Sequence, residues 1–392
     1  MFYLFPLILS KLSFLGTFIS VLRIIRSTYP RVEEREHFLF AIICIIVLLF
    51  VWPSIEAGIK LWVLTSLIII SSLFYCSSPL LLYTFFELSL LPVLLLIIGW
   101  GVQSERVRAG FHLIIYTFLL SRPLFLIIVS TTNVSTQRRG PLFRLFIGIA
   151  FIVKTPLYFT HVWLPKAHVE APTAGSILLA RILLKIGGVG FIWTLNYCNC
   201  EFNLIYIFCA LLGATFAALT CSLQRDLKAL IAYRSIAHIN YSTFIVILHR
   251  VTRDSRRRLL ILRHSFVRRI LFLVGGTCFH RLRRRLIYFL KRTFLFKETF
   301  FLFLFLVSAG NFSIPPLLRF FGELSSLITS VNSLWVVSLP LCFYFLFVAY
   351  YSLFLLLSLV GKKGTLTIND NYTGCILIVT FCLADFLFLT FY

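Results

Sequence analysis

Four ionisable side chains interrupt long apolar stretches of this sequence. They are Glu87 in LLLYTFFELSLLPVLLLII, Lys154 in LFIGIAFIVKTPLYF, Lys185 in SILLARILLKIGGVGF and Glu323 in LLRFFGELSSLI. An ionisable group at the centre of a membrane-spanning helix costs at least about 2.5 kcal/mol, so each one needs a partner, a cavity or a function. Groups that change charge state in a poorly solvated interior can form a proton relay. A structural ion pair is the alternative, although buried pairs contribute little stability.

Histidines add to this set of titratable groups. His161 and His168 flank the segment HVWLPKAHVEAPTAGS, while His238 and His264 lie further along the chain. A neutral imidazole accepts one proton and donates another, so these residues suit a water-linked proton chain. A metal site is the competing interpretation, but the spacing of His161 and His168, with no carboxylate at ligand geometry, is not specific for one. We therefore predict no metal ligands.

The elements that must carry these residues are apolar helices. Of the 392 residues, 60% are hydrophobic and only 13% are charged, whereas soluble domains carry about 25% charged residues. Apolar runs of bilayer length predict about 13–14 transmembrane helices. The connections between them are too short to form a separate core. The sequence therefore predicts an all-α polytopic membrane protein with a single membrane domain over 1–392.

Two of the predicted spans contain helix breakers. Pro156 lies inside the apolar run 141–160, and a second break is expected over 311–316 in SAGNFSIPP. Proline removes one backbone hydrogen bond and clashes with the preceding turn. Broken backbone at membrane depth survives only where protein or water satisfies it, which favours a polar cavity. A plain interhelical turn is the alternative for 311–316.

The segment 154–191, KTPLYFTHVWLPKAHVEAPTAGSILLARILLKIGGVGF, makes a family resemblance visible. It closely resembles the central signature of subunit 4 in the antiporter-like proton-pumping family of respiratory NADH:ubiquinone oxidoreductase, complex I. The resemblance extends to 83–110, 224–242 and 311–324. Together these segments outline a proton-translocation core over 80–330. The resemblance also implies the family's antiporter-like fold, with inverted repeats and two discontinuous helices.

Roles for the membrane charges follow from the resemblance. It implies that Glu87 and Lys154 form the charged pair that gates proton transfer. Lys185 would be the central relay residue, and Glu323 the terminal one.

The resemblance gives the histidines a place as well. His238 and His264 fall where the family has histidines on the hydrophilic axis that connects the charged residues. The implied relay therefore comprises six residues, of which two are histidines.

The function implied by the resemblance is that of a core membrane subunit of complex I. It would translocate protons in the mitochondrial inner membrane while other subunits transfer electrons from NADH to ubiquinone. No GxGxxG motif or CxxC cluster is present in the sequence, so we expect no redox centre or bound cofactor in this chain. NAD and ubiquinone would be used by the whole complex, and the partners would be its other membrane subunits.

Two other functions remain open. The first is a subunit of a multi-subunit Na⁺/H⁺ antiporter, which shares the central signature. The second is a structural scaffold that no longer pumps. A scaffold would be expected to lose the membrane charges, and all four are retained.

The charge balance is unusual for a membrane protein. The net charge is +23, 27 of the 37 basic residues are Arg, and the chain has a single Met. Translation with a genetic code that reads AGA and AGG as Arg in place of Ser, and ATA as Ile in place of Met, would produce both features. We hypothesise this for five positions: Arg181, Arg234, Arg268, Arg269 and Arg319. A basic surface that binds cardiolipin-like lipid is the alternative. Nucleic acid is not expected, because basic residues lie between and within apolar spans.

Overall fold

The computed structural model describes about half of the chain, and these residues form two compact units, 1–89 and 90–392. The described residues are 57–75, 78–101, 104–132, 150–179, 183–184, 186–188, 204–248, 271–272, 276, 286–287, 294–295, 305, 308, 318–359 and 366–367.

The first unit contributes two described helices that pack against each other, α3 (Ala57–Tyr75) and α4 (Pro79–Leu88). Pro79 occupies the first position of α4, where its missing N–H costs nothing because that group has no intrahelical acceptor. Glu87 lies in the last turn of α4.

The second unit begins with α5 (Leu90–Trp100) and α6 (Arg106–Ile114), which pack together. The chain then continues through a π-helical turn, η2 (Ile115–Leu119), into α7 (Arg122–Thr132). Gly101 ends α5 in a tight turn. A Cβ there would collide with the Ile97 carbonyl oxygen and with Arg106, so no other residue fits this close approach.

A run of short helical pieces follows in place of one long helix. A helix ends at Lys154, and the chain then forms η3 (Tyr158–Thr160), α9 (Trp163–Glu170) and α10 (Thr173–Leu178). α9 packs against α6 and against a later helix, α13 (Leu227–Leu248). The discontinuity predicted at Pro156 is confirmed. The break predicted over 311–316 lies outside the described residues.

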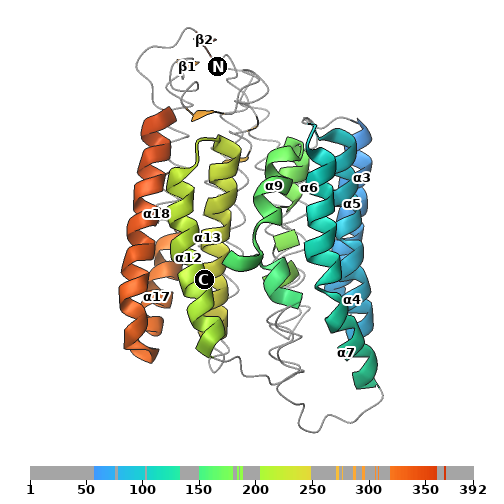
Figure 1. The fold of residues 1–392 in the computed structure, drawn as a ribbon, viewed down its shortest axis with the longest axis horizontal. Helices are drawn as coiled ribbons and strands as arrows, with labels where there is room; N and C mark the ends of the chain where they lie inside the picture. Colours follow the sequence, from blue (N-terminus) through green and yellow to red (C-terminus); the bar gives the residue numbers. More distant parts are fainter. Residues whose placement is uncertain are drawn as a thin grey trace, which may run out of the picture. The chain divides into compact units, whose positions relative to one another are not determined.

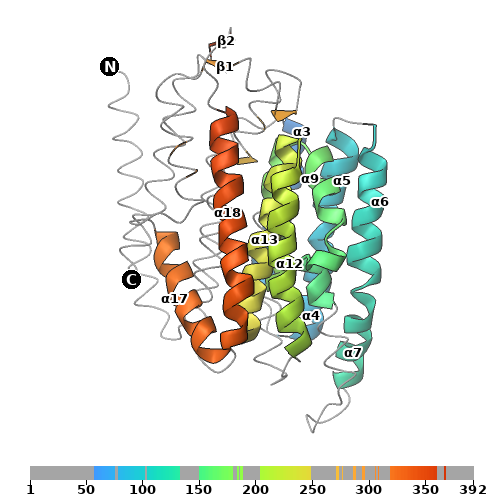
Figure 2. The same ribbon diagram turned by 60° about the vertical axis from the view of Figure 1, so that its left-hand side comes forward.

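The longest helices lie side by side, as Figures 1 and 2 show. α12 (Leu204–Leu223) packs against both α13 and α18 (Ser338–Leu359). The small side chains of Ala210, Ala214 and Ala217 are fully buried in α12, and small residues let helix backbones approach closely in a membrane.

The remaining described elements are one further helix, one 3₁₀ turn and two short strands. α17 (Leu318–Ser333) contacts α13 and leads through η5 (Trp335–Val337) into α18. Two-residue strands, β1 (Phe294–Leu295) and β2 (Leu366–Thr367), pair in parallel. The described part of the chain is otherwise helical, in agreement with the predicted all-α class.

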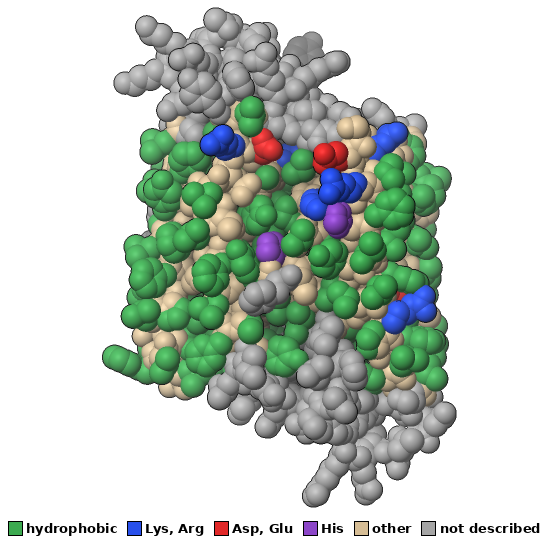
Figure 3. All heavy atoms as spheres, in the orientation of Figure 1, with side chains coloured by type: hydrophobic (Ala, Val, Ile, Leu, Met, Phe, Trp, Pro, Cys, Tyr) green, Lys and Arg blue, Asp and Glu red, His purple; other side chains and the backbone are tan. Residues whose placement is uncertain are grey.

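Four described stretches are long and apolar enough to cross a membrane, namely Leu80–Trp100, Arg106–Val129, Tyr206–Leu223 and Trp335–Leu357. Hydrophobic side chains cover much of the visible face in Figure 3. On the last stretch Leu339, Leu346 and Leu357 are each more than 60% exposed. Exposed apolar side chains repeated along a helix of this length are expected to face lipid.

Candidate functional site

The break at Pro156 leaves helix carbonyls without their usual donors, and the sequence supplies replacements. Because Pro156 has no N–H, the Ile152 carbonyl instead accepts from the Leu157 N–H at 3.2 Å. The Val153 carbonyl accepts from the indole N–H of Trp163 at 3.3 Å. These bonds stabilise an interrupted helix inside the protein, as membrane depth requires.

Lys154 is the last helical residue before this break, and its side chain is buried, with 5% exposed. The turn containing Gly187 approaches closely, since a Cβ at Gly187 would lie 3.1 Å from the Lys154 carbonyl carbon and 3.2 Å from the Thr155 nitrogen. A larger residue at position 187 would therefore push this turn away from the break. A buried ammonium beside interrupted backbone is a typical arrangement for an ion pathway.

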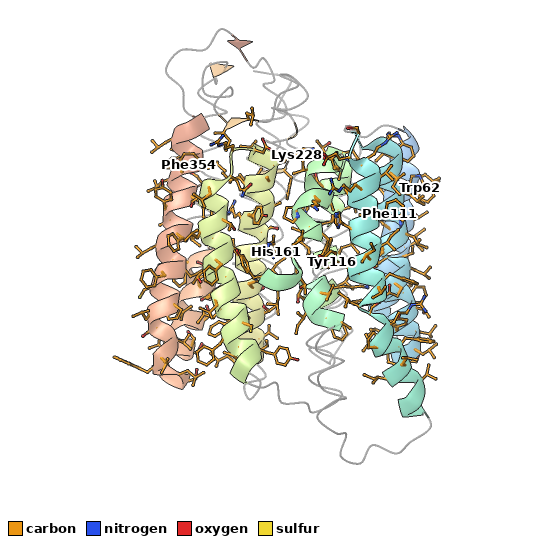
Figure 4. All side chains as sticks on the ribbon, in the orientation of Figure 1. Trp62, Phe111, Tyr116, His161, Lys228 and Phe354 are labelled. Atoms are coloured by element: carbon orange, nitrogen blue, oxygen red, sulfur yellow. The ribbon has the colours of Figure 1, made fainter. Side chains whose placement is uncertain are left out.

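A second polar cluster surrounds η3. The ring of His161 stacks on Tyr158 with centroids 4.6 Å apart and meets the edge of Tyr233 at 5.8 Å. Figure 4 shows His161 beside the middle of α12 and α13. Within the described part of the chain, Nδ1 of His161 is buried and has no hydrogen-bond partner. Such an atom costs about 1–3 kcal/mol, so this position is suited to bind internal water.

Asn240 on α13 faces the same cluster. It is fully buried, and among the described residues neither atom of its amide group has a hydrogen-bond partner. Gly213 on α12 provides the space, because a Cβ there would lie 3.0 Å both from the Asn240 amide nitrogen and from Cβ of Tyr158. The cluster thus places an amide and an imidazole next to the helix break.

His238 is held by two tyrosines from a single helix. Its Nδ1 lies 2.7 Å from the hydroxyl of Tyr344, and its Nε2 lies 2.9 Å from the hydroxyl of Tyr351. His238 is 4% exposed, Tyr344 1% and Tyr351 0%. Both ring nitrogens therefore have a partner that can either donate or accept.

A series of ring and hydrogen-bond contacts leads from His238 towards α17. The ring of Tyr344 stacks on Tyr241 at 4.9 Å, and the Tyr241 hydroxyl lies 2.8 Å from the Ser326 hydroxyl. Ser326 in turn donates to the Glu323 carbonyl at 2.8 Å. Glu323 itself is buried on α17, with 8% exposed. The contacts therefore lead from His238 to the α17 backbone at Glu323, the residue whose carboxylate belongs to the predicted relay.

Of the three other predicted relay residues, one is described by the structure and two are not. Glu87 is half-buried on α4 in the first unit. Lys185 and His264 lie outside the described residues. The six assigned relay roles therefore remain predictions, four of them on residues whose position is described.

Several buried polar residues were not assigned a role from the sequence. Lys228 is 3% exposed and donates to the Ala171 carbonyl at 3.1 Å, next to the end of α9. Glu170 in α9 is 5% exposed. A charge inside an apolar stretch could have marked Lys228, in the motif QRDLKALIAY. Tyr344 and Tyr351 gave no such signal, because they are two of 16 tyrosines in an aromatic-rich chain.

His168 is fully buried and stacks on Phe272 with centroids 4.7 Å apart. Among the described residues, no group of three His, Cys, Asp or Glu side chains could hold a metal ion.

These features define a polytopic membrane protein with a discontinuous helix and buried ionisable side chains. The family model described as NADH:quinone oxidoreductase/Mrp antiporter, TM, matches residues 76–349. The chain belongs to this family. The resemblance inferred from the sequence motifs is thereby confirmed.

Relatives carry more particular names. NADH-ubiquinone oxidoreductase chain 4 of Aedes aegypti is 37% identical over 287 residues, covering 70% of this chain and 64% of the relative. The protein of the same name from Ascaris suum is 35% identical over 299 residues, covering 74% of this chain and 72% of the relative. The chain thus spans somewhat less than two thirds of the Aedes aegypti protein.

A solved structure shares the fold. A chain of respiratory complex I from Thermus thermophilus with bound NADH superposes with a TM-score of 0.78 at 19% identity, covering 89% of this chain and 79% of that one. The predicted antiporter-like membrane fold is confirmed.

Proposed function

We propose that this chain is a core membrane subunit of NADH:ubiquinone oxidoreductase in the mitochondrial inner membrane. It translocates protons across that membrane, driven by electron transfer from NADH to ubiquinone in other subunits. The observation that carries the proposal is the family match over 76–349, which contains all six relay residues. The names of the animal relatives support the complex and the organelle.

The described residues suggest how protons would move. Lys154 ends a helix beside interrupted backbone, and the His161 and Asn240 atoms next to that break are suited to hold water. A lysine in such a place can release and take up a proton as its charged surroundings change. Quinone reduction elsewhere would change the pairing of Glu87 and Lys154, and the proton would pass through Lys185 and His264 towards His238 and Glu323.

The chain works within a larger assembly under this proposal. NAD and ubiquinone bind to other subunits, and this chain holds no cofactor. Its partners are the other membrane subunits of the complex. Cardiolipin-type lipid is a further expected partner, contacting basic residues at the membrane surface.

The proposal is tested by proton pumping in vesicles that contain the purified complex. Glu87→Gln should abolish most pumping and most quinone-linked NADH oxidation, because a neutral amide cannot switch the charge of Lys154. The assembled complex should still migrate as one band on a native gel. Glu105→Gln is a matched control, since Glu105 is exposed in the turn before α6. Unaltered pumping in Glu87→Gln vesicles would remove Glu87 from the relay.

A second candidate is a subunit of a Na⁺/H⁺ antiporter assembly, because the family description includes the Mrp antiporter. The energy source of proton movement distinguishes these two functions. An antiporter would exchange Na⁺ for protons without NADH, whereas the proposed subunit moves protons only while NADH is oxidised.

A further inference from the structure

We propose that Tyr344 and Tyr351 are relay residues that pass a proton through the ring of His238 along α18. The inference rests on the proposed function, since it extends the proton path of that same relay. It assigns a role to two tyrosines that neither the sequence motifs nor the family resemblance singled out.

The geometry supplies a continuous hydrogen-bonded triad. The Tyr344 hydroxyl meets Nδ1 of His238 at 2.7 Å, and the Tyr351 hydroxyl meets Nε2 at 2.9 Å. Both distances are in the normal range for hydrogen bonds. The imidazole therefore has a hydroxyl on each side, and both hydroxyls belong to one helix.

The chemistry follows from the two tautomers of a neutral imidazole. With the proton on Nδ1, that N–H donates to the Tyr344 oxygen, and the Tyr351 hydroxyl donates to Nε2. In one transfer Tyr351 gives its proton to Nε2 and is reprotonated by a hydronium ion on its far side, and the proton that Tyr344 releases is taken up by a water molecule. Nδ1 gives its proton to Tyr344, which releases its own onward. One proton has then crossed, no group retains a charge, and the imidazole is left in the other tautomer.

The triad runs along the helix axis. Tyr344 and Tyr351 are seven residues apart, so at 1.5 Å per residue their backbones are separated by about 10 Å along α18. α18 is part of a membrane-length stretch. A proton that crosses the triad thus moves along a membrane-spanning helix, which is a step across the bilayer and not within its plane.

Each end of the triad adjoins a polar neighbour. At one end, Tyr351 neighbours position 234, whose guanidinium lies 5.9 Å from its ring, and a serine at that position would also be polar. At the other end, Tyr344 stacks on Tyr241, whose hydroxyl meets Ser326 on α17. The Tyr344 end of the triad therefore lies towards α17, the helix that carries Glu323.

The test compares phenylalanine variants in the assembled complex. Tyr344→Phe and Tyr351→Phe remove one hydroxyl each and keep the packed ring. We expect each to lower NADH-driven pumping by roughly a hundredfold or more, the range for loss of a positioned proton-transfer group. Both hydroxyls lie in the same proposed proton path, so loss of either one already blocks that path. The double variant should therefore pump no more slowly than the slower single variant. Tyr350→Phe is the matched control, because Tyr350 is 59% exposed on the same helix.

Two further measurements separate a proton path from mere packing. NADH oxidation by ferricyanide, which needs no proton translocation, should be unchanged in every variant. His238→Gln keeps a hydrogen-bond donor and an acceptor between the two tyrosine hydroxyls, but an amide has no second tautomer. The variant should therefore assemble and fail to pump. Wild-type pumping by the His238→Gln variant would overturn the proposed tautomer step.

Other outcomes decide the proposal. If Glu87→Gln blocks pumping while both phenylalanine variants pump at the wild-type rate, the triad is not in the path and only this inference is overturned. Multiplying defects in the double variant would show two independent packing effects and would also overturn it. A wild-type complex that does not pump with NADH would overturn the proposed function as well.

Discussion

Arg234 is a charged residue buried within the apolar part of the protein. It lies one helical turn before His238 on α13 and is 3% exposed. A guanidinium buried at membrane depth costs at least about 2.5 kcal/mol, and the ring of Tyr351 lies 5.9 Å from this one. A serine would fill this position without a buried charge.

We therefore expect Ser at position 234 in the protein made by the organism. The codon should be AGA or AGG, read as Ser by the organelle's genetic code. Peptide mass spectrometry across 229–240 should show a residue lighter than Arg and no tryptic cleavage after position 234. A CGN codon, or cleavage there, would show that the arginine is real.

Lys185 gives a second prediction at the residue scale. Lys185→Arg should impair proton transfer strongly although the positive charge is kept, because a guanidinium does not readily deprotonate. Pumping and NADH oxidation in vesicles measure the effect, with Lys185→Ala as the comparison. Full pumping by Lys185→Arg would mean that this residue acts only through its charge.

A residue's role could be predicted from the sequence only where its type differs from that of the residues around it. Glu87, Lys154 and Glu323 were recognisable because a charge stands out in an apolar run. Tyr344, Tyr351 and Asn240 were not, because their role comes from long-range packing between α13, α12 and α18. A tyrosine in an apolar helix looks the same whether its hydroxyl meets lipid headgroups or a buried histidine.

At the scale of elements, the interrupted helix at Pro156 is the feature on which the proton path most depends. Its freed carbonyls are bonded by Leu157 and Trp163, and the η3 turn that follows carries the polar cluster of His161. An unbroken helix here would displace the η3 turn and the cluster that it carries.

Pro156→Ala should therefore lower pumping while leaving the complex assembled. Alanine restores the N–H that can bond the Ile152 carbonyl and favours a continuous helix. Proton uptake by vesicles measures the loss. Pro340→Ala is the control, because Pro340 is the third residue of α18, where proline removes no intrahelical bond. Equal pumping in the two variants would mean that the break has no part in transfer.

Gly213 gives a prediction about helix packing. Gly213→Val should press against Asn240 and Tyr158, both already within 3.0 Å of a Cβ at that position. Overpacking of this kind costs about 1–3 kcal/mol. The expected result is a lower temperature of loss of NADH:ubiquinone activity in the solubilised complex. Gly99→Val is the control, because nothing lies within 4 Å of a Cβ there; equal effects would contradict the close approach.

The break at Pro156 could be predicted because proline acts locally. The choice of helix partners could not, because α12 and α18 are apolar on nearly every face and α13 carries polar residues on all sides, so their sequences have no strong directional pattern. Which faces meet is decided by small residues such as Ala214 and by buried polar contacts, and both are visible only in the folded chain.

At the scale of the whole molecule, we propose that this chain moves protons inside a complex whose other subunits transfer the electrons. Composition alone gave the all-α membrane class, because 60% hydrophobic residues leave too few polar ones for a soluble surface. The family followed from long motifs within the matched region 76–349. Composition could not distinguish a pump from an antiporter, since both need the same buried charges.

The most direct test is to identify the complex to which this chain belongs in its native membrane. Mild solubilisation, separation of intact complexes on a native gel and staining for NADH oxidation would locate the chain, with mass spectrometry to identify it in the gel. The account predicts that it migrates with a large NADH-oxidising band whose quinone-linked activity is sensitive to rotenone. Migration in a smaller band without NADH oxidation would contradict the account and favour the antiporter assembly.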